Sequence, residues 1–439
     1  MKASNAFSAA LLLLSFCAPR AQSQTATVNW NKTDQIIDGF GASDASHWIP
    51  LTSAQATLFF SPTAGVGLSL LRTQVPDDGS CSIISTTCAG QVIDMQLAIA
   101  NGARVWSTPW SPPASTKSNG NLDNGGTLLV GSYAPYANYL ANYAKSLSTL
   151  YGINLYGLSV QNEPTASAVW ASSVWSPANF DTFIGTNLGP TFAAEGLSPL
   201  IILPETSSWQ QLAPYSNAIL SDSTALGYVG IVATHDYNHG NPIPAYTVGQ
   251  FAGKHLWQTE VCDHNTFDPS ITSALTYAQQ LNDWLTVANA NAWHYWWLIG
   301  LNGDNEGLLD SASGIVAKRL YAIGNYSKFV RPGFYRIDAT ATPQTGVSVS
   351  AYKNSTTGAL VIVVINQNSS NVSQSFALNG TMVYHLTPWI TSASLDLAPQ
   401  STLNTNGSSF TYTLPGSSVT SFVGNTTAAP PAGLAAVVR

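Results

Sequence analysis

The sequence has 439 residues, of which 45% are hydrophobic and only 8% charged, and its formal net charge is −7 at pH 7. The 15 Lys and Arg residues form no basic cluster, which argues against a nucleic-acid partner, because such binding depends on clustered cations. The length allows a large catalytic domain with a smaller second one, and neutral polar residues must supply most of the soluble surface.

The first 23 residues have the layout of a cleavable secretory signal. Lys2 precedes an apolar run centred on 9–16, and small residues follow near Ala21. We therefore expect a secreted protein. No later stretch reaches the ~18 uninterrupted apolar residues of a membrane-spanning helix, so we expect no membrane association.

Three cysteines remain once the signal is removed. Cys81 and Cys88 are close enough in sequence to close a small loop, and we expect a disulfide between them. Cys262 is then predicted to be a buried thiol. A zinc site is the alternative, but the sequence has no CxxC motif, and the prolines that directly follow His235 and His239 disfavour a metal-binding helix there. We expect no metal.

Residues 24–35 open the mature chain with a strand-like alternation, and residues 36–332 then repeat a short apolar strand followed by a helical stretch. This repetition is typical of α/β architecture. The best parse gives eight strands, the number that a closed (β/α)₈ TIM barrel needs. These strands are expected at 36–42, 66–75, 104–108, 155–161, 200–203, 229–234, 255–259 and 292–297. Amphipathic helices are predicted at 135–151 and 270–288.

The pattern changes in the last quarter of the chain. Alternating β segments separated by Asn, Ser and Gly turns predict a β-sandwich side domain over residues 333–426. We expect the N-terminal strand of residues 24–35 to join this sandwich, which makes the side domain discontinuous in sequence. The Ala- and Pro-rich residues 427–439 are predicted to be a disordered tail.

Two glutamates follow apolar strands in the same way. Glu163 ends the segment Leu158-Ser-Val-Gln-Asn-Glu, and Glu260 ends His255-Leu-Trp-Gln-Thr-Glu. In a barrel, both strand ends face the mouth where ligands bind. Either glutamate alone is also compatible with a cap of the next helix, but two such residues are the pair that glycoside hydrolysis requires, one to donate a proton and one to attack the anomeric carbon.

Several further motifs, spread over nearly the whole mature chain, resemble glycoside hydrolase family 30. Within that family the similarity is greatest to the bacterial xylanase subfamily known for glucuronoxylanases. The motifs are Asp38-Gly-Phe-Gly41, Trp106-Ser-Thr-Pro-Trp110-Ser-Pro-Pro, Val160-Gln-Asn-Glu-Pro164, Thr234-His-Asp-Tyr237, Trp257-Gln-Thr-Glu260 and Tyr326-Ser-Lys-Phe-Val-Arg-Pro-Gly333. The resemblance implies a barrel with a fused β-sandwich and a retaining, endo-acting mechanism.

The resemblance also assigns roles to individual residues. Glu163 matches the family's general acid/base and Glu260 its nucleophile. Asn162 matches the residue expected to contact the sugar 2-hydroxyl. Four more residues are expected to bind substrate or orient the nucleophile, with simple barrel packing as the alternative for each: Trp110, His235, Tyr237 and Trp296. Arg72 is predicted to be a buried ion-pair partner that orients the carboxylates.

The sequence departs from the subfamily where glucuronoxylanases bind their acidic branch. The segment 295–304 contains no Arg, and Val261-Cys262-Asp263 contains no Tyr. Asp304 and Glu306 would repel a uronate. We therefore expect an endo-β-1,4-xylanase with weak or no dependence on glucuronate. β-1,6-Glucan, β-1,6-galactan and glucosylceramide, the substrates of other branches of the family, remain alternatives.

Other classes of function find less support. A carbohydrate-binding protein without turnover is the main non-enzymatic alternative, although both glutamates and Asn162 are in place. A serine hydrolase is disfavoured because no Gly-x-Ser-x-Gly motif is present. Two carboxylates suffice for glycoside hydrolysis, so we expect no cofactor. The predicted partner is a polysaccharide, and the protein is predicted to be a monomer.

Overall fold

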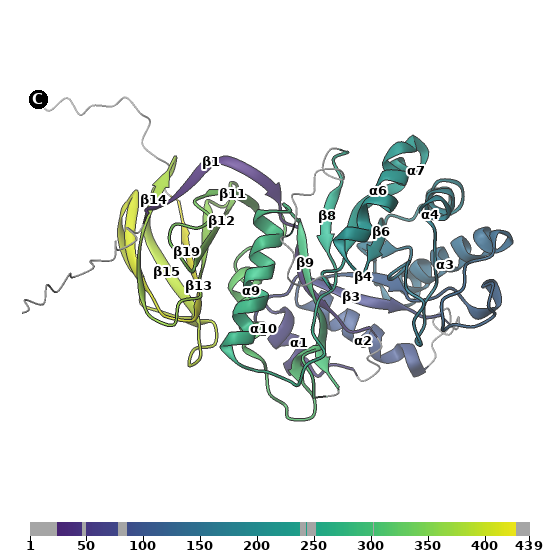
Figure 1. Ribbon diagram of the computed structural model, residues 1–439, viewed down its shortest axis with the longest axis horizontal. Helices are drawn as coiled ribbons and strands as arrows, with labels where there is room; N and C mark the ends of the chain where they lie inside the picture. Colours follow the sequence, from purple (N-terminus) through teal and green to yellow (C-terminus); the bar gives the residue numbers. More distant parts are fainter. Residues whose placement is uncertain are drawn as a thin grey trace, which may run out of the picture.

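The computed structural model describes residues 24–45, 50–77, 86–237, 243, 252–301 and 303–426. Its two lobes, a barrel and a β-sandwich, lie side by side, with helices α9 (Ile271–Thr286) and α10 (Lys318–Ser327) at their junction (Figure 1). The expected signal peptide, the expected tail and Cys81 lie outside the described residues. Only the backbone of Cys88 is described, in helix α2 (Thr86–Ala100), so the expected disulfide stays a prediction.

Within the described residues, eight parallel strands form a closed barrel. Each strand pairs with the next, and the last pairs with the first through Phe40 opposite Trp293, which confirms the predicted TIM barrel. The strands are β2 (Gly39–Ser43), β3 (Leu70–Val75), β4 (Arg104–Pro109), β5 (Gly157–Ser159), β6 (Leu200–Thr206), β7 (Val229–Thr234), β8 (His255–Gln258) and β9 (Ala292–Gly300). A short strand, β10 (Gly307–Asp310), pairs with β9.

Helices connect and cover the strands. Local sequence fixes several of their ends: Ser270 caps α9 by accepting a hydrogen bond from the Ser273 backbone, and Gly152 ends α3 in the left-handed conformation at φ 68°. The other α-helices are α1 (Ser53–Phe60), α3 (Tyr133–Tyr151), α4 (Pro177–Phe183), α5 (Gly189–Ala194), α6 (Leu212–Ser221) and α7 (Ser223–Tyr228). A π-helical turn spans Ile184–Leu188, and 3₁₀ turns span Ala114–Thr116, Val130–Ser132 and Trp209–Gln211.

The barrel interior is filled with apolar side chains. Six strands contribute to one buried cluster, in which Trp106 and Trp257 meet edge to face at 5.6 Å. At the N-terminal end of β8, the Asp38 carboxylate accepts hydrogen bonds from His255 Nδ1 at 2.6 Å and from Trp257 Nε1 at 2.7 Å. Because the barrel interior is filled by packed and hydrogen-bonded side chains, a ligand is expected to bind at the C-terminal ends of the strands.

The second lobe is built on a ten-stranded sheet whose apolar face encloses a separate core. Phe376, Phe410 and Phe422 lie at its centre, with the first two rings stacked at 4.6 Å. Its strands are β1 (Ala26–Ile36), β11 (Tyr335–Ala339), β12 (Val347–Asn354), β13 (Ala359–Asn366), β14 (Val372–Asn379), β15 (Val383–Thr391), β16 (Ala398–Pro399), β17 (Leu403–Gly407), β18 (Ser409–Leu414) and β19 (Ser418–Asn425).

Strand β1 links the lobes. It pairs in parallel with β14 and antiparallel with β11, and Figure 1 shows it arching from the sandwich toward the barrel. Ile36 completes β1 by pairing with Tyr335, so the first barrel strand begins at Gly39 and not at Ile36 as predicted. The sandwich thus receives strands from both ends of the described chain.

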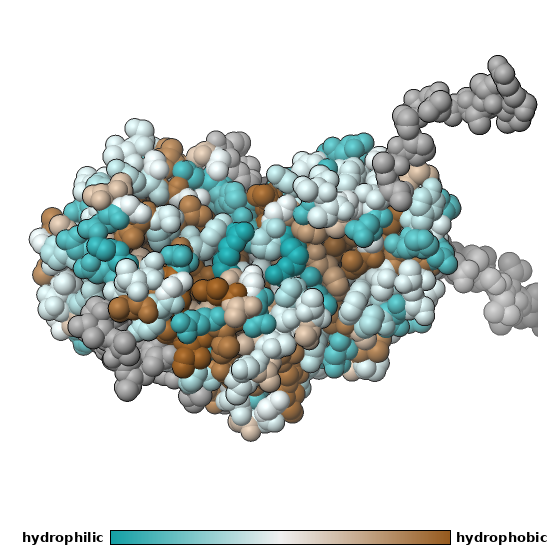
Figure 2. Space-filling view, turned by 180° about the vertical axis from the view of Figure 1, so that it is seen from behind, coloured by the Kyte–Doolittle hydropathy of each residue, from teal (hydrophilic) through white to brown (hydrophobic). Residues whose placement is uncertain are grey.

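On the face in Figure 2, pale and hydrophilic residues cover most of both lobes, and hydrophobic residues lie in separate patches. None of the helices in the described part of the chain has the length and apolar character needed to cross a bilayer.

Candidate active site

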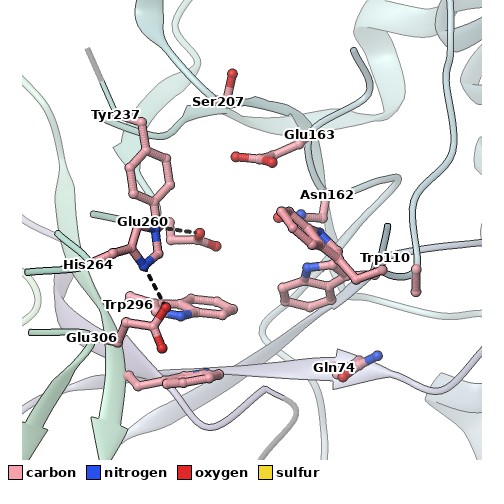
Figure 3. Close-up of a pocket in the computed structure, with 13 residues that line it drawn as sticks. Gln74, Trp110, Asn162, Glu163, Ser207, Tyr237, Glu260, His264, Trp296 and Glu306 are labelled. Carbon is pink, nitrogen blue, oxygen red and sulfur yellow. Dashed lines mark hydrogen bonds and ion pairs between the residues drawn. The ribbon is translucent and has the colours of Figure 1, made fainter. Parts of the chain in front are cut away.

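A pocket of about 590 Å³ opens at the C-terminal ends of the barrel strands. Glu163 reaches it from the turn after β5, where its backbone adopts φ 45°, and Glu260 reaches it two residues after β8. Figure 3 shows these two side chains facing each other across the pocket. The lining residues are Gln74, Trp110, Asn162, Glu163, Trp170, Ala171, Ser207, Tyr237, Glu260, His264, Trp296, Trp297 and Glu306.

The two glutamates lie close together. One carboxylate oxygen of Glu163 and one of Glu260 are within 4.8 Å of each other. In glycosidases, carboxyl groups ~5 to 5.5 Å apart belong to retaining enzymes, and inverting enzymes need ~6.5 to 9.5 Å to admit a water. The pair therefore has the spacing at which one carboxylate attacks carbon directly while the other transfers the proton.

Arg72, on β3, forms ion pairs with two of the buried carboxylates. Its fully buried guanidinium forms an ion pair with Glu260 Oε2 and another, at 3.1 Å, with Glu205 Oε1. It also donates a hydrogen bond of 2.7 Å to Asn162 Oδ1. This confirms the predicted buried ion pair, and it fixes Glu260 and Asn162 from one planar group.

Glu205 is a component of the site that the sequence analysis missed. It follows the apolar residues of β6 as Glu163 and Glu260 follow their strands, so the same signal was present. Its side chain is fully buried and accepts a hydrogen bond of 2.8 Å from Thr108 Oγ1. Burial alone would raise the pKa of Glu205, but Arg72 and His235 outweigh burial and lower it to about 2. Glu205 is therefore ionised at neutral pH.

His235 lies beside both glutamates, within the barrel interior. It is fully buried behind the carboxylates and does not reach the pocket surface. Its Nδ1 lies 3.1 Å from Glu163 Oε1, and its Nε2 lies 3.7 Å from Glu260 Oε2 and 3.9 Å from Glu205 Oε1. Burial lowers the pKa of His235, but the carboxylates, Glu260 foremost, raise it to about 9. The imidazole is thus a buried cation at neutral pH, and it contacts Glu163 most closely.

Tyr237 is the residue that contacts Glu260 from the pocket side. Its hydroxyl donates a hydrogen bond of 2.7 Å to Glu260 Oε1, drawn as a dashed line in Figure 3, and lies 3.5 Å from Cys262 Sγ. Cys262 is buried, as expected, and burial raises the pKa of its thiol. Glu260 is therefore held at both oxygens, by Arg72 on one and by Tyr237 on the other.

Aromatic rings form the walls of the pocket. Trp110 and Trp296 have their ring centroids 5.9 Å apart, and Trp297 stacks on Trp296 at 5.0 Å. Trp170 lies in the segment between β5 and α4, beyond Glu163, and is 57% exposed. Flat apolar rings that remain open to solvent in a pocket suit the faces of sugar rings.

The rim carries a hydrogen-bonded pair. His264 Nδ1 lies 2.7 Å from Glu306 Oε1, across the loops that follow β8 and β9. Burial and then Asp304 raise the pKa of Glu306, and His264 opposes them. The Glu306 side chain is mostly buried and the His264 side chain mostly exposed, so the carboxylate is part of the pocket wall.

Comparisons with known proteins agree with this geometry. Residues 89–307 match the glycosyl hydrolase family 30 TIM-barrel domain, and residues 333–422 match the family 30 beta sandwich domain. The chain is 34% identical over 412 residues to glucuronoxylanase XynC from Bacillus subtilis (strain 168), covering 91% of each protein. Two solved structures are also similar. The family 30 subfamily 8 xylanase Xyn30A from Clostridium acetobutylicum has a TM-score of 0.83 and 32% identity over 91% of this chain and 99% of that one. The catalytic domain of xylanase C from Talaromyces cellulolyticus has a TM-score of 0.80 and 27% identity over 92% of this chain and 100% of that one.

Proposed function

Because this chain belongs to glycoside hydrolase family 30, we propose that it is a retaining endo-β-1,4-xylanase in which Glu163 is the acid/base and Glu260 the nucleophile. The observation that carries this proposal is the approach of the two carboxylates to within 4.8 Å in an aromatic-lined pocket. The similarity to xylanases from Bacillus subtilis, Clostridium acetobutylicum and Talaromyces cellulolyticus supports xylan as the substrate.

The reaction proceeds by double displacement. Glu163, protonated, gives its proton to the glycosidic oxygen as the ionised Glu260 attacks the anomeric carbon, and the leaving chain departs as an alcohol. Glu163, now ionised, then takes a proton from water, whose oxygen attacks the same carbon and releases Glu260. Each glutamate is thereby returned to its starting state.

The surroundings prepare Glu260 for attack. Arg72 and Tyr237 each bind one of its oxygens, which fixes the carboxylate plane. The side-chain carbonyl oxygen of Asn162 accepts a hydrogen bond from Arg72, so its amide nitrogen is the atom that can contact the sugar 2-hydroxyl. Orientation of this kind lowers the barrier because the groups need not reorganise during the reaction.

We further propose that glucuronate branches are not required. The wall where β8 and β9 end presents the Glu306 carboxylate, hydrogen-bonded to His264, with Asp304 close by. A negative wall disfavours a uronate and accepts neutral hydroxyls. Residues 1–23 support export of the enzyme, which N-terminal sequencing of the secreted protein would test.

The proposal is tested by substrate, stereochemistry and variants together. Plain xylan, glucuronoxylan, arabinoxylan, β-1,6-glucan and β-1,6-galactan are compared, and the anomer first formed is followed by NMR. We expect xylo-oligosaccharides of retained configuration from plain xylan. Glu260→Gln should lose activity by several orders of magnitude, and the surface variant Glu195→Gln, which alters only an exposed ion pair with Lys145, should retain it.

Two results would contradict the proposal in different ways. Inverted product would refute the assignment of Glu260 as nucleophile. Turnover of a β-1,6-glycan without turnover of any xylan would keep the catalytic pair and refute the substrate.

A further inference from the structure

The site contains more charge than the two reacting glutamates. Arg72 and His235 are both cations at neutral pH, and both are fully buried. The anions near them are Glu260 and Glu205. Glu205 has no exposed side-chain surface and is absent from the pocket lining, so it cannot touch substrate.

The charges of these buried residues and the two glutamates sum to zero both before and after the first step of the reaction. Before the reaction, two cations face the two anions Glu205 and Glu260, and a neutral, protonated Glu163 completes an uncharged site. After the first step, Glu260 is a neutral ester and Glu163 is ionised. Two cations then face Glu205 and Glu163, and the site is again uncharged. Glu205 is the one anion present in both halves, and buried charge without such a balance is costly.

We propose that Glu205 is a positioning residue that acts as the fixed counter-anion of the double displacement, keeping Glu163 protonated in the first half and ionised in the second. The inference rests on the proposed retaining mechanism and deepens it. Glu205 acts through Arg72 and His235, which it contacts at 3.1 and 3.9 Å, and not on the sugar itself.

The position of Glu205 is defined on several sides. Thr108 binds its Oε2, and its own backbone carbonyl accepts the backbone N–H of Glu163 at 3.0 Å. The charged and titratable groups that face the cluster are Arg72 from β3, Glu163 after β5, His235 and Tyr237 after β7, Glu260 after β8, and His294 from β9. Burial lowers the pKa of His294 to about 3, so it stays neutral and does not enter the balance.

Glu205→Gln tests the proposal because it removes the charge and keeps the shape. The site then carries an excess positive charge that favours loss of the Glu163 proton. We expect kcat/KM on xylo-oligosaccharides, whose leaving groups need acid help, to fall about tenfold at a pH above the basic limb, because a one-unit shift of that limb removes about that share of protonated Glu163. Dinitrophenyl xylobioside needs little acid help, and its glycosylation rate should fall less than about twofold. The basic limb of the pH profile on xylo-oligosaccharides should move down by about one pH unit.

Two variants separate charge from structure. Glu205→Asp keeps the charge, so it should lower the rate on both substrates about equally and leave the basic limb in place. Thr108→Val removes the neutral donor to Glu205 and should also leave the basic limb unchanged. Circular dichroism and thermal melts check that each variant is folded. Should Glu205→Gln fail to fold, the Asp variant still decides, because a basic limb that moved with the charge intact would overturn the proposal.

The configuration of the wild-type product tests the double displacement, and the behaviour of Glu205→Gln on the two substrates tests the role of Glu205. If the wild-type enzyme inverts configuration, the double displacement is wrong whatever Glu205 does. If the wild type retains configuration but Glu205→Gln loses both substrates equally, with an unmoved basic limb, Glu205 has only a structural role.

Discussion

Replacing Arg72 by Met should destabilise the protein in a manner that depends on pH. The variant leaves Glu205 and Glu260 buried without their shared cation. In the wild type, the pKa of Glu205 is lowered from 4.5 to about 2, which corresponds to roughly 3 kcal/mol of stability. Removing one partner of a buried ion pair costs a similar amount, about 3 to 5 kcal/mol. At pH 7 we expect the Tm to drop by about 5 to 10 °C.

The sign of the pH effect follows from the lowered pKa. A carboxyl whose pKa is lowered by folding stabilises the protein above its unfolded pKa of 4.5 and loses that contribution as the pH falls toward 2. In Arg72→Met, burial is opposed by His235 alone and the pKa of Glu205 rises above its wild-type value, so the carboxyl takes up a proton at a higher pH and the cost of its buried charge falls. The Tm difference between wild type and variant should therefore shrink as the pH falls from 7 to 4.

Differential scanning calorimetry at pH 4, 5.5 and 7 measures this difference directly. Lys32→Met is the matched control, because Lys32 pairs with Asp338 in the open, where such pairs contribute about 0 to 1 kcal/mol. A Tm difference for Arg72→Met that stayed the same at every pH would refute the charge argument.

Three further predictions concern other parts of the molecule. Trp170→Ala should raise KM for xylan roughly five- to tenfold, since ring stacking contributes about 1 kcal/mol or more, and Val169→Ala, a more exposed neighbour outside the pocket lining, should not. Glu306→Gln should raise the ratio of glucuronoxylan to plain-xylan activity about two- to fivefold, in keeping with a partly exposed charge, and an unchanged ratio would exclude Glu306 as the discriminating group. The hydrogen bond to Asp38 raises the pKa of His255, so its stabilisation is complete below about pH 6.5 and fades as the pH rises through the raised pKa. Thermal melts of His255→Asn should accordingly show the largest loss near pH 5.5 and the smallest near pH 9.

The sequence located the two glutamates of the site because each follows a recognisable apolar strand. A barrel of eight such strands brings their ends together whatever the exact boundaries, and this is why Glu163 and Glu260 were predicted to share one pocket. Trp110 and Trp296 line that pocket, as expected; Trp110 directly follows β4, and Trp296 lies at the middle of β9.

Contacts between side chains were harder to predict. His235 was expected to orient the nucleophile and the substrate hydroxyls; it lies 3.7 Å from Glu260, but it is nearer Glu163, at 3.1 Å, and does not line the pocket. Glu205 went unnoticed although it follows the apolar residues of β6 in the same pattern. In both cases the partner is set by the direction of the side chain once the barrel has closed, and spacing along the chain carries no information about that direction.

Strand β1 bears on how this enzyme can be rebuilt. The described residues start in the sandwich, continue through the barrel and return to the sandwich. The barrel therefore cannot be separated from the sandwich by cutting the chain at one position. A fusion partner attached before Ala26 or after Asn425 would meet the same lobe, the β-sandwich. Transfer of the barrel into another protein would require transfer of the β-sandwich as well. Recombination should therefore exchange the two lobes together, as one unit.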